Sequence, residues 1–201
     1  MAYLGHIISA QGVALDPTKV QVIHDWSALR SARGFLGLTG YYRKFVQDYG
    51  KIVVPLTSLL KKEGFSWNDE AQTAFQALKA AVTSAPVLAL PDFTKGFIVE
   101  CDASTHGFGA VLLQEHHPIA YFSRPVAPRH RALAAYEWEL IGLVNVVRHW
   151  RPYLRGVRSS SAPTTTASSS SSTSVSRRSR STIGWASSSA STFRWNTSRV
   201  P

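Results

Sequence analysis

Apolar residues change their spacing once along this chain, near Pro91, and that change limits the folds open to it. Before Pro91, apolar side chains recur at intervals of three and four residues, which is the spacing of amphipathic helices. After Pro91, apolar and polar residues alternate over short segments, which is the spacing of strands. Helices followed by strands indicate an α/β or α+β architecture in two parts.

The first part is expected to begin with a short strand and to continue with four helices. Residues 3–9 alternate and are followed by a turn at Gly12. Asp16 and Pro17 are the residue types favoured at the cap and the first position of a helix. The later helices are expected at residues 33–49, 54–62 and 69–85.

In the second part, after Pro91, the sequence pattern predicts three consecutive antiparallel strands and one long helix. The strands are expected at residues 96–102, 109–114 and 118–124. The helix should run from residue 133 to residue 154. The inward stripe of this helix is expected to consist of Leu140, Leu143 and Val147.

Composition excludes several classes of protein. The chain has no run of eighteen apolar residues, and its start lacks the basic flank and long apolar stretch of a secretory signal. We therefore expect neither membrane insertion nor export, and an intracellular location whose compartment the sequence does not specify. The single cysteine, Cys101, excludes an internal disulfide and a cysteine-based zinc site, so any metal would be held by carboxylates.

The composition changes abruptly near Gly156. Residues 157–201 contain 17 serines, 7 threonines and six arginines but no acidic residue, so this tail carries +6 of the net charge of +10. We expect the tail to be disordered, because such a segment has too little apolar surface to bury.

Two carboxylates stand where they could meet. Asp102 ends the first strand of the second part, and Glu139 lies one turn into the long helix, on or near its expected inward face. Carboxylates that converge from a strand and a helix suit a hard divalent cation such as Mg²⁺. The alternative is structural: Asp102 caps the turn at residues 103–105, and Glu139 pairs with a neighbouring base.

At these residues the sequence resembles the ribonuclease H domain of gypsy-type LTR retrotransposon Pol polyproteins. The segments that carry this resemblance are APVLALPDFTKGFIVECDASTHGFGAVLLQ, PIAYFSR and YEWELIGLV. Earlier segments resemble, in order, the end of the reverse transcriptase palm, the thumb, and the connection to ribonuclease H. These are YLGHIISAQGVALDPTKVQVIHDW, RGFLGLTGYYRKFVQDYG and PLTSLLKKEGFSWNDEAQTAFQALKAAV.

The resemblance implies an RNase H-like fold that hydrolyses the RNA strand of an RNA/DNA hybrid. Two Mg²⁺ ions roughly 3.5 to 4 Å apart would then hold the attacking water and the leaving oxygen. By this resemblance, Asp102 would bridge the two ions and Glu139 would ligate one of them. Glu137 lies two residues away on the helix and is expected to face solvent.

Two departures from the family limit the expected activity. The family's polymerase motif, Tyr-X-Asp-Asp, is absent, so this chain should not copy nucleic acid. The family's Thr-Asp-His strand should follow the long helix, but residues 157–172 are mostly serine and threonine instead. With only Asp102 and Glu139 left, we expect little or no hydrolysis. The fold would be a truncated RNase H-like fold, and the strand at 118–124 would keep an unpaired edge.

A shifted reading frame would account for the composition of the tail. If each new codon takes the last base of one codon and the first two of the next, threonine codons yield Tyr, His, Asn or Asp. Thr164, Thr165 and Thr166 can then read Asp-His-Tyr, which is part of the missing strand. We therefore expect residues from about Val157 onward to be an out-of-frame translation. The alternative is an authentic Arg/Ser-rich tail that binds phosphate backbones without sequence preference.

These observations divide the chain into three expected regions. Residues 1–64 would hold the palm end and thumb, residues 65–156 the connection and the first half of the RNase H-like domain, and residues 157–201 the tail. The expected partner is an RNA/DNA hybrid or another nucleic acid, and the alternative functions are a living hydrolase and a nonspecific nucleic-acid-binding protein.

Basic residues of the thumb and connection could grip a hybrid's backbone, as these helices do in the family. The candidates are Arg43, Lys44, Lys51, Lys61 and Lys62. The alternative is that these side chains belong to ordinary solvated helix faces.

Overall fold

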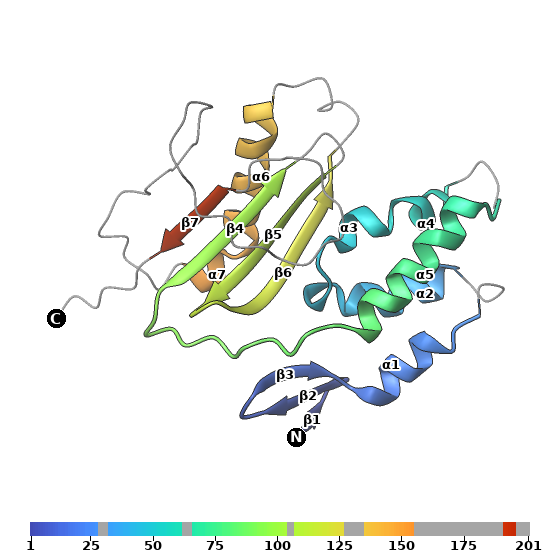
Figure 1. Ribbon diagram of the computed structural model, residues 1–201, viewed down its shortest axis with the longest axis horizontal. Coiled ribbons are helices and arrows are strands. Elements are labelled where there is room, and N and C mark those ends of the chain that lie inside the picture. Colours follow the sequence, from blue (N-terminus) through green and yellow to red (C-terminus); the bar gives the residue numbers. More distant parts are fainter. Residues whose placement is uncertain (28–31, 62–65, 104–106, 127–134, 155–190, 196–201) are drawn as a thin grey trace, which may run out of the picture.

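The computed structural model describes residues 1–27, 32–61, 66–103, 107–126, 135–154 and 191–195. Figure 1 shows two groups of elements side by side: a sheet with a helix packed on it, and a set of helices with a smaller sheet below them. Within the described ranges, no helix is long and apolar enough to cross a membrane.

The chain begins with a small antiparallel sheet of three short strands. They are β1 (Ala2–Tyr3), β2 (His6–Ser9) and β3 (Gly12–Leu15). At Gly12 a Cβ atom would lie 2.1 Å from the carbonyl oxygen of Leu88, so only glycine lets the two backbones approach so closely. Val13 and Leu88 then exchange two backbone hydrogen bonds of 2.8 Å, which fasten the link that follows the helices to this sheet.

Two helices begin at the expected residues because each has a side-chain cap. Helix α1 (Pro17–His24) starts after Asp16, whose carboxylate accepts a hydrogen bond from the backbone N–H of Thr18. Helix α5 (Asp69–Thr83) starts after Asn68, which accepts from the backbone N–H of Ala71. Both helices were expected from the sequence.

The single helix expected at residues 33–49 is wrong. The structure has α2 (Ala32–Tyr41), the 3₁₀ turn η1 (Arg43–Phe45) and α3 (Tyr49–Ile52), and α4 (Val54–Ser58) follows. The break occurs because Asp48, just before α3, adopts a left-handed backbone conformation with φ of 55°, which no helix interior allows. Tyr42 and Phe45 are still buried, so the apolar spacing in this segment reflects a shared core rather than one continuous helix.

The helices share one apolar core. Its centre is a contact between the rings of Phe35 on α2 and Phe75 on α5, whose centroids lie 4.5 Å apart. Leu78 and Val82 continue the buried face of α5, as their spacing predicted.

The second core lies under a four-stranded antiparallel sheet. Its strands are β4 (Phe97–Ala103), β5 (Gly107–Gln114), β6 (His117–Pro125) and β7 (Ser191–Trp195), in the spatial order β6-β5-β4-β7. Helices α6 (Ala135–His149) and α7 (Arg151–Leu154) lie behind the sheet (Figure 1). The expected order of three strands and a long helix is therefore confirmed.

The inward face of α6 differs from the expected one. Leu140 is 59% exposed, whereas Val146 and Trp150 are buried. The helix is turned so that Gly142 faces the sheet, where a Cβ would lie 3.3 Å from Cβ of Phe108 and 3.7 Å from Sγ of Cys101. The small residue lets the helix approach the strands closely, and this close contact decides the rotation of the helix.

The tail supplies a strand that the sequence did not predict. Strand β7 pairs antiparallel with β4, with Val99 opposite Phe193. It lies within the segment expected to be disordered, and residues 155–190 and 196–201 lie outside the described ranges. The edge of β4 has backbone N–H and C=O groups that need partners, which explains why a segment of such composition can pair there.

The opposite edge of the sheet is covered, which corrects the open edge expected for the strand at 118–124. Helix α3 and the turn η1 pack against β6 (Figure 1). The backbone N–H of Gly50 donates a 2.7 Å hydrogen bond to the hydroxyl of Ser123. The helical part therefore takes the place of a sheet partner at this edge.

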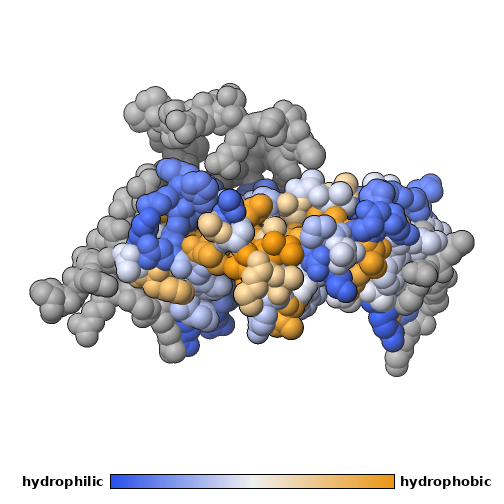
Figure 2. All heavy atoms as spheres, turned by 90° about the horizontal axis from the view of Figure 1, so that it is seen from below, coloured by the Kyte–Doolittle hydropathy of each residue, from blue (hydrophilic) through white to orange (hydrophobic). Residues whose placement is uncertain are grey.

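Exposed apolar side chains gather on one face of the molecule. Figure 2 shows apolar residues in the middle of the face seen from below Figure 1. In the first strands and in the link before β4, the exposed apolar residues include Tyr3, Leu4, Val87, Leu90 and Phe93.

Candidate active site

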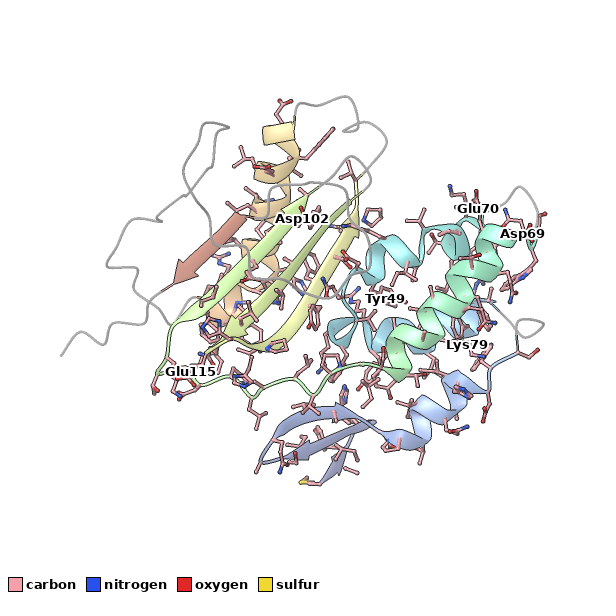
Figure 3. All side chains as sticks on the ribbon, in the orientation of Figure 1. Tyr49, Asp69, Glu70, Lys79, Asp102 and Glu115 are labelled. Atoms are coloured by element: carbon pink, nitrogen blue, oxygen red, sulfur yellow. The ribbon has the colours of Figure 1, made fainter. Side chains whose placement is uncertain are left out.

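Asp102 lies near the end of β4 and on the face of the sheet opposite α6. Its neighbour Cys101 packs toward Gly142 of α6, and successive residues of a strand point to opposite faces. Asp102 is half-buried and stands opposite Gly109 in the pairing of β4 with β5. Figure 3 labels Asp102 at the upper part of the sheet. The strand end thus presents a carboxylate beside a residue that has no side chain.

Asp48 occupies the space that Gly109 leaves free. A Cβ at position 109 would lie only 2.6 Å from Oδ1 of Asp48. Nζ of Lys51 lies 3.1 Å from the same oxygen, and the Lys51 side chain is only 13% exposed. The Asp48–Lys51 ion pair, at the start of α3, therefore lies against β5, the strand next to the one that holds Asp102.

A small hollow of about 170 Å³ separates this ion pair from the strands. It is lined by Gln47, Asp48, Glu100, Cys101, Asp102, Gly109, Ala110, Val111 and Tyr121. Glu100 and Asp102 share one face of β4, since they are two residues apart. The hollow is therefore acidic on the β4 side, and Asp48 adds a third carboxylate that is already paired with Lys51.

Glu139 acts on the same end of β4 from the other face. It precedes Gly142 by three residues, so both lie on the side of α6 that meets Cys101. Burial, followed by the negative charges of Asp102 and Glu139, raises the pKa of the Cys101 thiol to about 12, while the positive charge of Lys51 opposes them. The two predicted carboxylates therefore flank Cys101, one on each face.

Glu139 and Glu137 do not differ in their class of side-chain burial. Both side chains are half-buried, whereas Glu137 was expected to face solvent. The start of α6 is thus less exposed than the helical period alone suggests. Of these two glutamates, only Glu139 contributes to the raised pKa of Cys101, and its role as a metal ligand stays a prediction.

The donor chemistry of Asp102 and Glu139 suits Mg²⁺, but these residues alone do not make a complete site. Carboxylate oxygens are the ligands that a hard cation takes. Among the described residues, no group of three or more His, Cys, Asp or Glu side chains is arranged to hold a metal ion. The segment where the family's third carboxylate was expected, after Gly156, lies outside the described ranges.

The predicted basic residues are spread over the helical part. Arg43 and Lys44 lie in η1, and Nζ of Lys44 sits 5.2 Å from the centroid of the Phe45 ring. Partial desolvation lowers the pKa of Lys44. Lys61 is exposed just after α4, and Lys62 lies outside the described residues.

Sequence reasoning did not link Asp48 and Lys51 to Asp102. Lys51 was considered only as a backbone-gripping residue, and Asp48 was not considered. The three-residue spacing between Asp48 and Lys51 is compatible with an ion pair. Their approach to β5 depends on Gly109, which is far away in the sequence, and no local signal could have revealed it.

The chain is similar to known proteins over most of its own length. Residues 67–161 match the model of the RNase H-like domain found in reverse transcriptase. The Pol polyprotein of transposon 297 from Drosophila melanogaster is 40% identical over 159 residues, which cover 77% of this chain and 15% of that protein. The Pol polyprotein of transposon gypsy from the same organism is 37% identical over 172 residues, covering 78% of this chain and 17% of that protein.

A shorter relative matches a different share of the chain. An uncharacterized mitochondrial protein of Arabidopsis thaliana is 55% identical over 103 residues, covering 49% of this chain and 65% of that protein. This chain therefore spans less than two thirds of each of these relatives, and only a small part of the transposon polyproteins.

A solved structure has the same fold. The foamy viral protease-reverse transcriptase in complex with an RNA/DNA hybrid superposes with a TM-score of 0.72 at 21% identity, covering 78% of this chain and 22% of that chain. At this identity the similarity establishes the fold alone. The chain thus contains an RNase H-like domain of the kind found in reverse transcriptase, and its homologues are retrovirus-related Pol polyproteins from transposons, gypsy among them.

Proposed function

We propose that this chain is a remnant of the region of a Pol polyprotein that cleaves the RNA strand of an RNA/DNA hybrid, and that it binds such a hybrid without cleaving it. The observation that carries this proposal is geometric: Asp102 lines the hollow near the end of β4, and Glu139 lies three residues before Gly142, which packs against Cys101. The similarity to a reverse transcriptase in complex with a hybrid supports the choice of partner.

The residues of the candidate site indicate how well it could support metal-dependent hydrolysis of the hybrid. When bound, Mg²⁺ would supply Lewis acidity and activate a water for attack on phosphorus. Asp102 would offer its carboxylate oxygens to the cation from the hollow side of β4, whereas Glu139 would offer its own from the α6 side. Asp48 would contribute little to that task, because its carboxylate is paired with Lys51 at 3.1 Å. Two carboxylates leave most of the coordination positions of two cations to water, so efficient hydrolysis is not expected.

The test compares binding and cleavage in one experiment. A hybrid with a fluorescent RNA strand is incubated with the full chain and Mg²⁺, and with the Asp102→Asn variant. We expect the wild type to bind the hybrid but to cleave it no faster than the variant. Cleavage that needs Mg²⁺ and is lost in Asp102→Asn would show that the chain is a living hydrolase. Absence of hybrid binding would overturn the proposed partner.

The inactivity is proposed to result from a loss of reading frame near Gly156. The test is to read the genomic DNA and to produce a second chain whose residues from Val157 onward are translated in the shifted frame. This chain should cleave the hybrid with Mg²⁺, and the cleavage should disappear with Asp102→Asn. A locus without a frame that restores the missing Thr-Asp-His strand contradicts this part of the proposal.

A nonspecific nucleic-acid-binding protein is the second candidate function. The excess of positive charge, +10 overall, favours it. Such a protein would bind single-stranded DNA, duplex DNA and hybrid with similar affinity, whereas the first proposal predicts a preference for the hybrid. Competition between these three nucleic acids at one salt concentration distinguishes the two functions.

A further inference from the structure

A cleft lined by basic side chains lies on the α6 side of the edge strand β6, away from the hollow beside Asp102. Its volume is about 400 Å³. Three elements meet there: η1 supplies Arg43, β6 supplies Phe122 and Arg124, and α6 supplies Asn145, Arg148 and His149. The last three are spaced by three and four residues or are adjacent, so one face of α6 presents them together.

The cleft gathers positive charge with no acidic residue in its lining. Within the described ranges, the ion pairs that are resolved lie elsewhere, in His24–Asp25, Lys51–Asp48 and Lys95–Glu115. The like charges interact, because the positive charge of Arg43 adds to burial in lowering the pKa of His149. Bringing cations together without an anion costs free energy, and a bound anion offsets that cost.

The floor of the cleft is held in place by ring stacking. The ring of His149 lies parallel to that of Phe122, with centroids 4.0 Å apart and an angle of 13° between the planes. Trp150, which is buried, packs edge-on against Phe122 with centroids 6.2 Å apart. The floor of the cleft is therefore a packed aromatic cluster, and Arg124 and Arg148 line the cleft around it.

The cleft lies level with the candidate active site across the sheet. Ser123, next to Arg124, pairs with Gly109, and Gly109 pairs with Asp102. Two strand spacings, about 10 Å, therefore separate the strand of Asp102 from the strand of Arg124. The cleft opens on the α6 face of the sheet, whereas Asp102 lies on the other face, so the cleft would contact a different part of a bound nucleic acid from the part beside Asp102.

We propose that this cleft binds a phosphodiester group of a nucleic-acid backbone, with Arg43, Arg124 and Arg148 as its ligands. Guanidinium groups match the geometry of phosphate oxygens through paired N–H donors. This inference deepens the proposed function and rests on nucleic-acid binding by the full chain. It adds Arg124, Arg148 and His149 to the basic residues that the sequence suggested.

The first measurement uses inorganic phosphate as the probe. The ring protons of His149 are followed by NMR during a phosphate titration of the full chain, and their assignment comes from the His149→Gln variant. We expect a saturable shift in the wild type that is lost in the Arg124→Ala/Arg148→Ala double variant. Both arginines are exposed, so the variant should keep the fold. Absence of a saturable shift in the wild type overturns the proposal.

The second measurement uses an RNA/DNA hybrid and its salt dependence. Loss of one phosphate contact lowers the slope of log K against log salt by about 1. We expect a decrease of this size in the double variant and no decrease in Arg151→Ala, whose exposed side chain lies outside the cleft lining. Equal slopes for wild type and double variant overturn the cleft proposal while hybrid binding stands. A wild type that binds phosphate but not the hybrid overturns both the proposed function and the backbone ligand.

Discussion

Gly50 of α3 lies directly against the backbone of Ser123 in β6. The N–H of Gly50 donates to the Ser123 hydroxyl at 2.7 Å, and a Cβ on Gly50 would lie 2.8 Å from the Ser123 carbonyl oxygen. This contact joins the helical part of the molecule to the edge of the sheet. It also covers a strand edge that would otherwise present unpaired backbone groups to other chains.

Replacing Gly50 with alanine should therefore weaken the junction. The added methyl group would meet backbone atoms of Ser123 and Arg124, which cannot move aside as a side chain can. We expect Gly50→Ala to lower the free energy of unfolding by about 2 kcal/mol, measured by urea denaturation. Gly37→Ala on α2 is the control, because nothing lies within 4 Å of its Cβ. That variant should gain about 0.5 to 1 kcal/mol, since alanine suits a helix better. Equal effects of the two substitutions would contradict the contact.

The rotation of α6 can be tested with two valines on the same helix. Val146 is fully buried, whereas Val144 is 40% exposed. We expect Val146→Ala to cost about 2 kcal/mol and Val144→Ala less than about 0.5 kcal/mol. Thermal or urea unfolding measures both. If Val144→Ala cost more unfolding free energy than Val146→Ala, the helix would have the orientation expected from the sequence, with Leu140 facing the core.

The proximity of Asp102 and Glu139 to Cys101 can be tested through the reactivity of this thiol. Because this is the only cysteine in the chain, its alkylation by iodoacetamide reports on one thiol. Both carboxylates raise the pKa of Cys101, which reaches about 12, so Asp102→Asn and Glu139→Gln should each lower it. We expect faster alkylation in both variants at a fixed alkaline pH.

Glu137→Gln is the matched control for this experiment, since Glu137 is not among the charges that act on Cys101. It should leave the alkylation rate at the wild-type value. If Glu137→Gln accelerates alkylation and Glu139→Gln does not, the choice of Glu139 as the site residue is wrong.

His6 should make the fold sensitive to acid. Burial, and then the positive charge of Lys44, lower the pKa of His6 from its ordinary 6.5. Its Nδ1 lies 2.9 Å from the Leu4 carbonyl oxygen, and its Nε2 is buried with no hydrogen-bond partner among the described residues. Below its ordinary pKa, the unfolded chain takes up a proton that the folded ring resists. The free energy of unfolding should therefore fall as the pH drops below about 6.5.

The His6→Phe variant isolates this effect. Phenylalanine keeps the ring contact with Phe45, whose centroid lies 5.5 Å from that of His6, but it cannot be protonated. We expect a weaker fall in unfolding free energy between about pH 7 and about pH 5 than in the wild type. Above this range the plots of unfolding free energy against pH for the two proteins should run parallel, and the difference between them then measures the change in packing alone. Curves that are parallel over the whole range would show that His6 does not contribute to acid sensitivity.

Much of the architecture could be predicted from local sequence. Asp16 before Pro17 marked the start of α1, and alternation after Pro91 marked β4, β5 and β6. The expected helix across residues 33–49 failed because Tyr42 and Phe45 share a core that a break in the helix also satisfies. Apolar spacing records which residues are buried, and it does not record where the backbone turns.

The candidate site, like the fold, was only partly predictable from the sequence. Asp102 and Glu139 were predicted from motifs; Asp102 lies near the end of β4, and Glu139 lies on α6 close to Gly142, which packs against Cys101. Lys51, paired with Asp48 beside that strand, and the arginines of the β6 cleft were not linked to these sites beforehand. Each of these groupings unites residues from elements that are distant in the chain, so no spacing along the sequence encodes it.

By itself, the sequence determined that helices precede strands, where α1, α5, β4, β5, β6 and α6 lie, which two carboxylates are the site candidates, and where the composition changes near Gly156. These features depend on neighbouring residues through caps, hydrophobic period and motif. Only the tertiary structure decided that α3 covers the edge of β6, that β7 covers the edge of β4, and that Gly142 sets the rotation of α6. The physical reason is that close approach and edge pairing depend on which distant backbone happens to arrive, and that is a property of the folded chain as a whole.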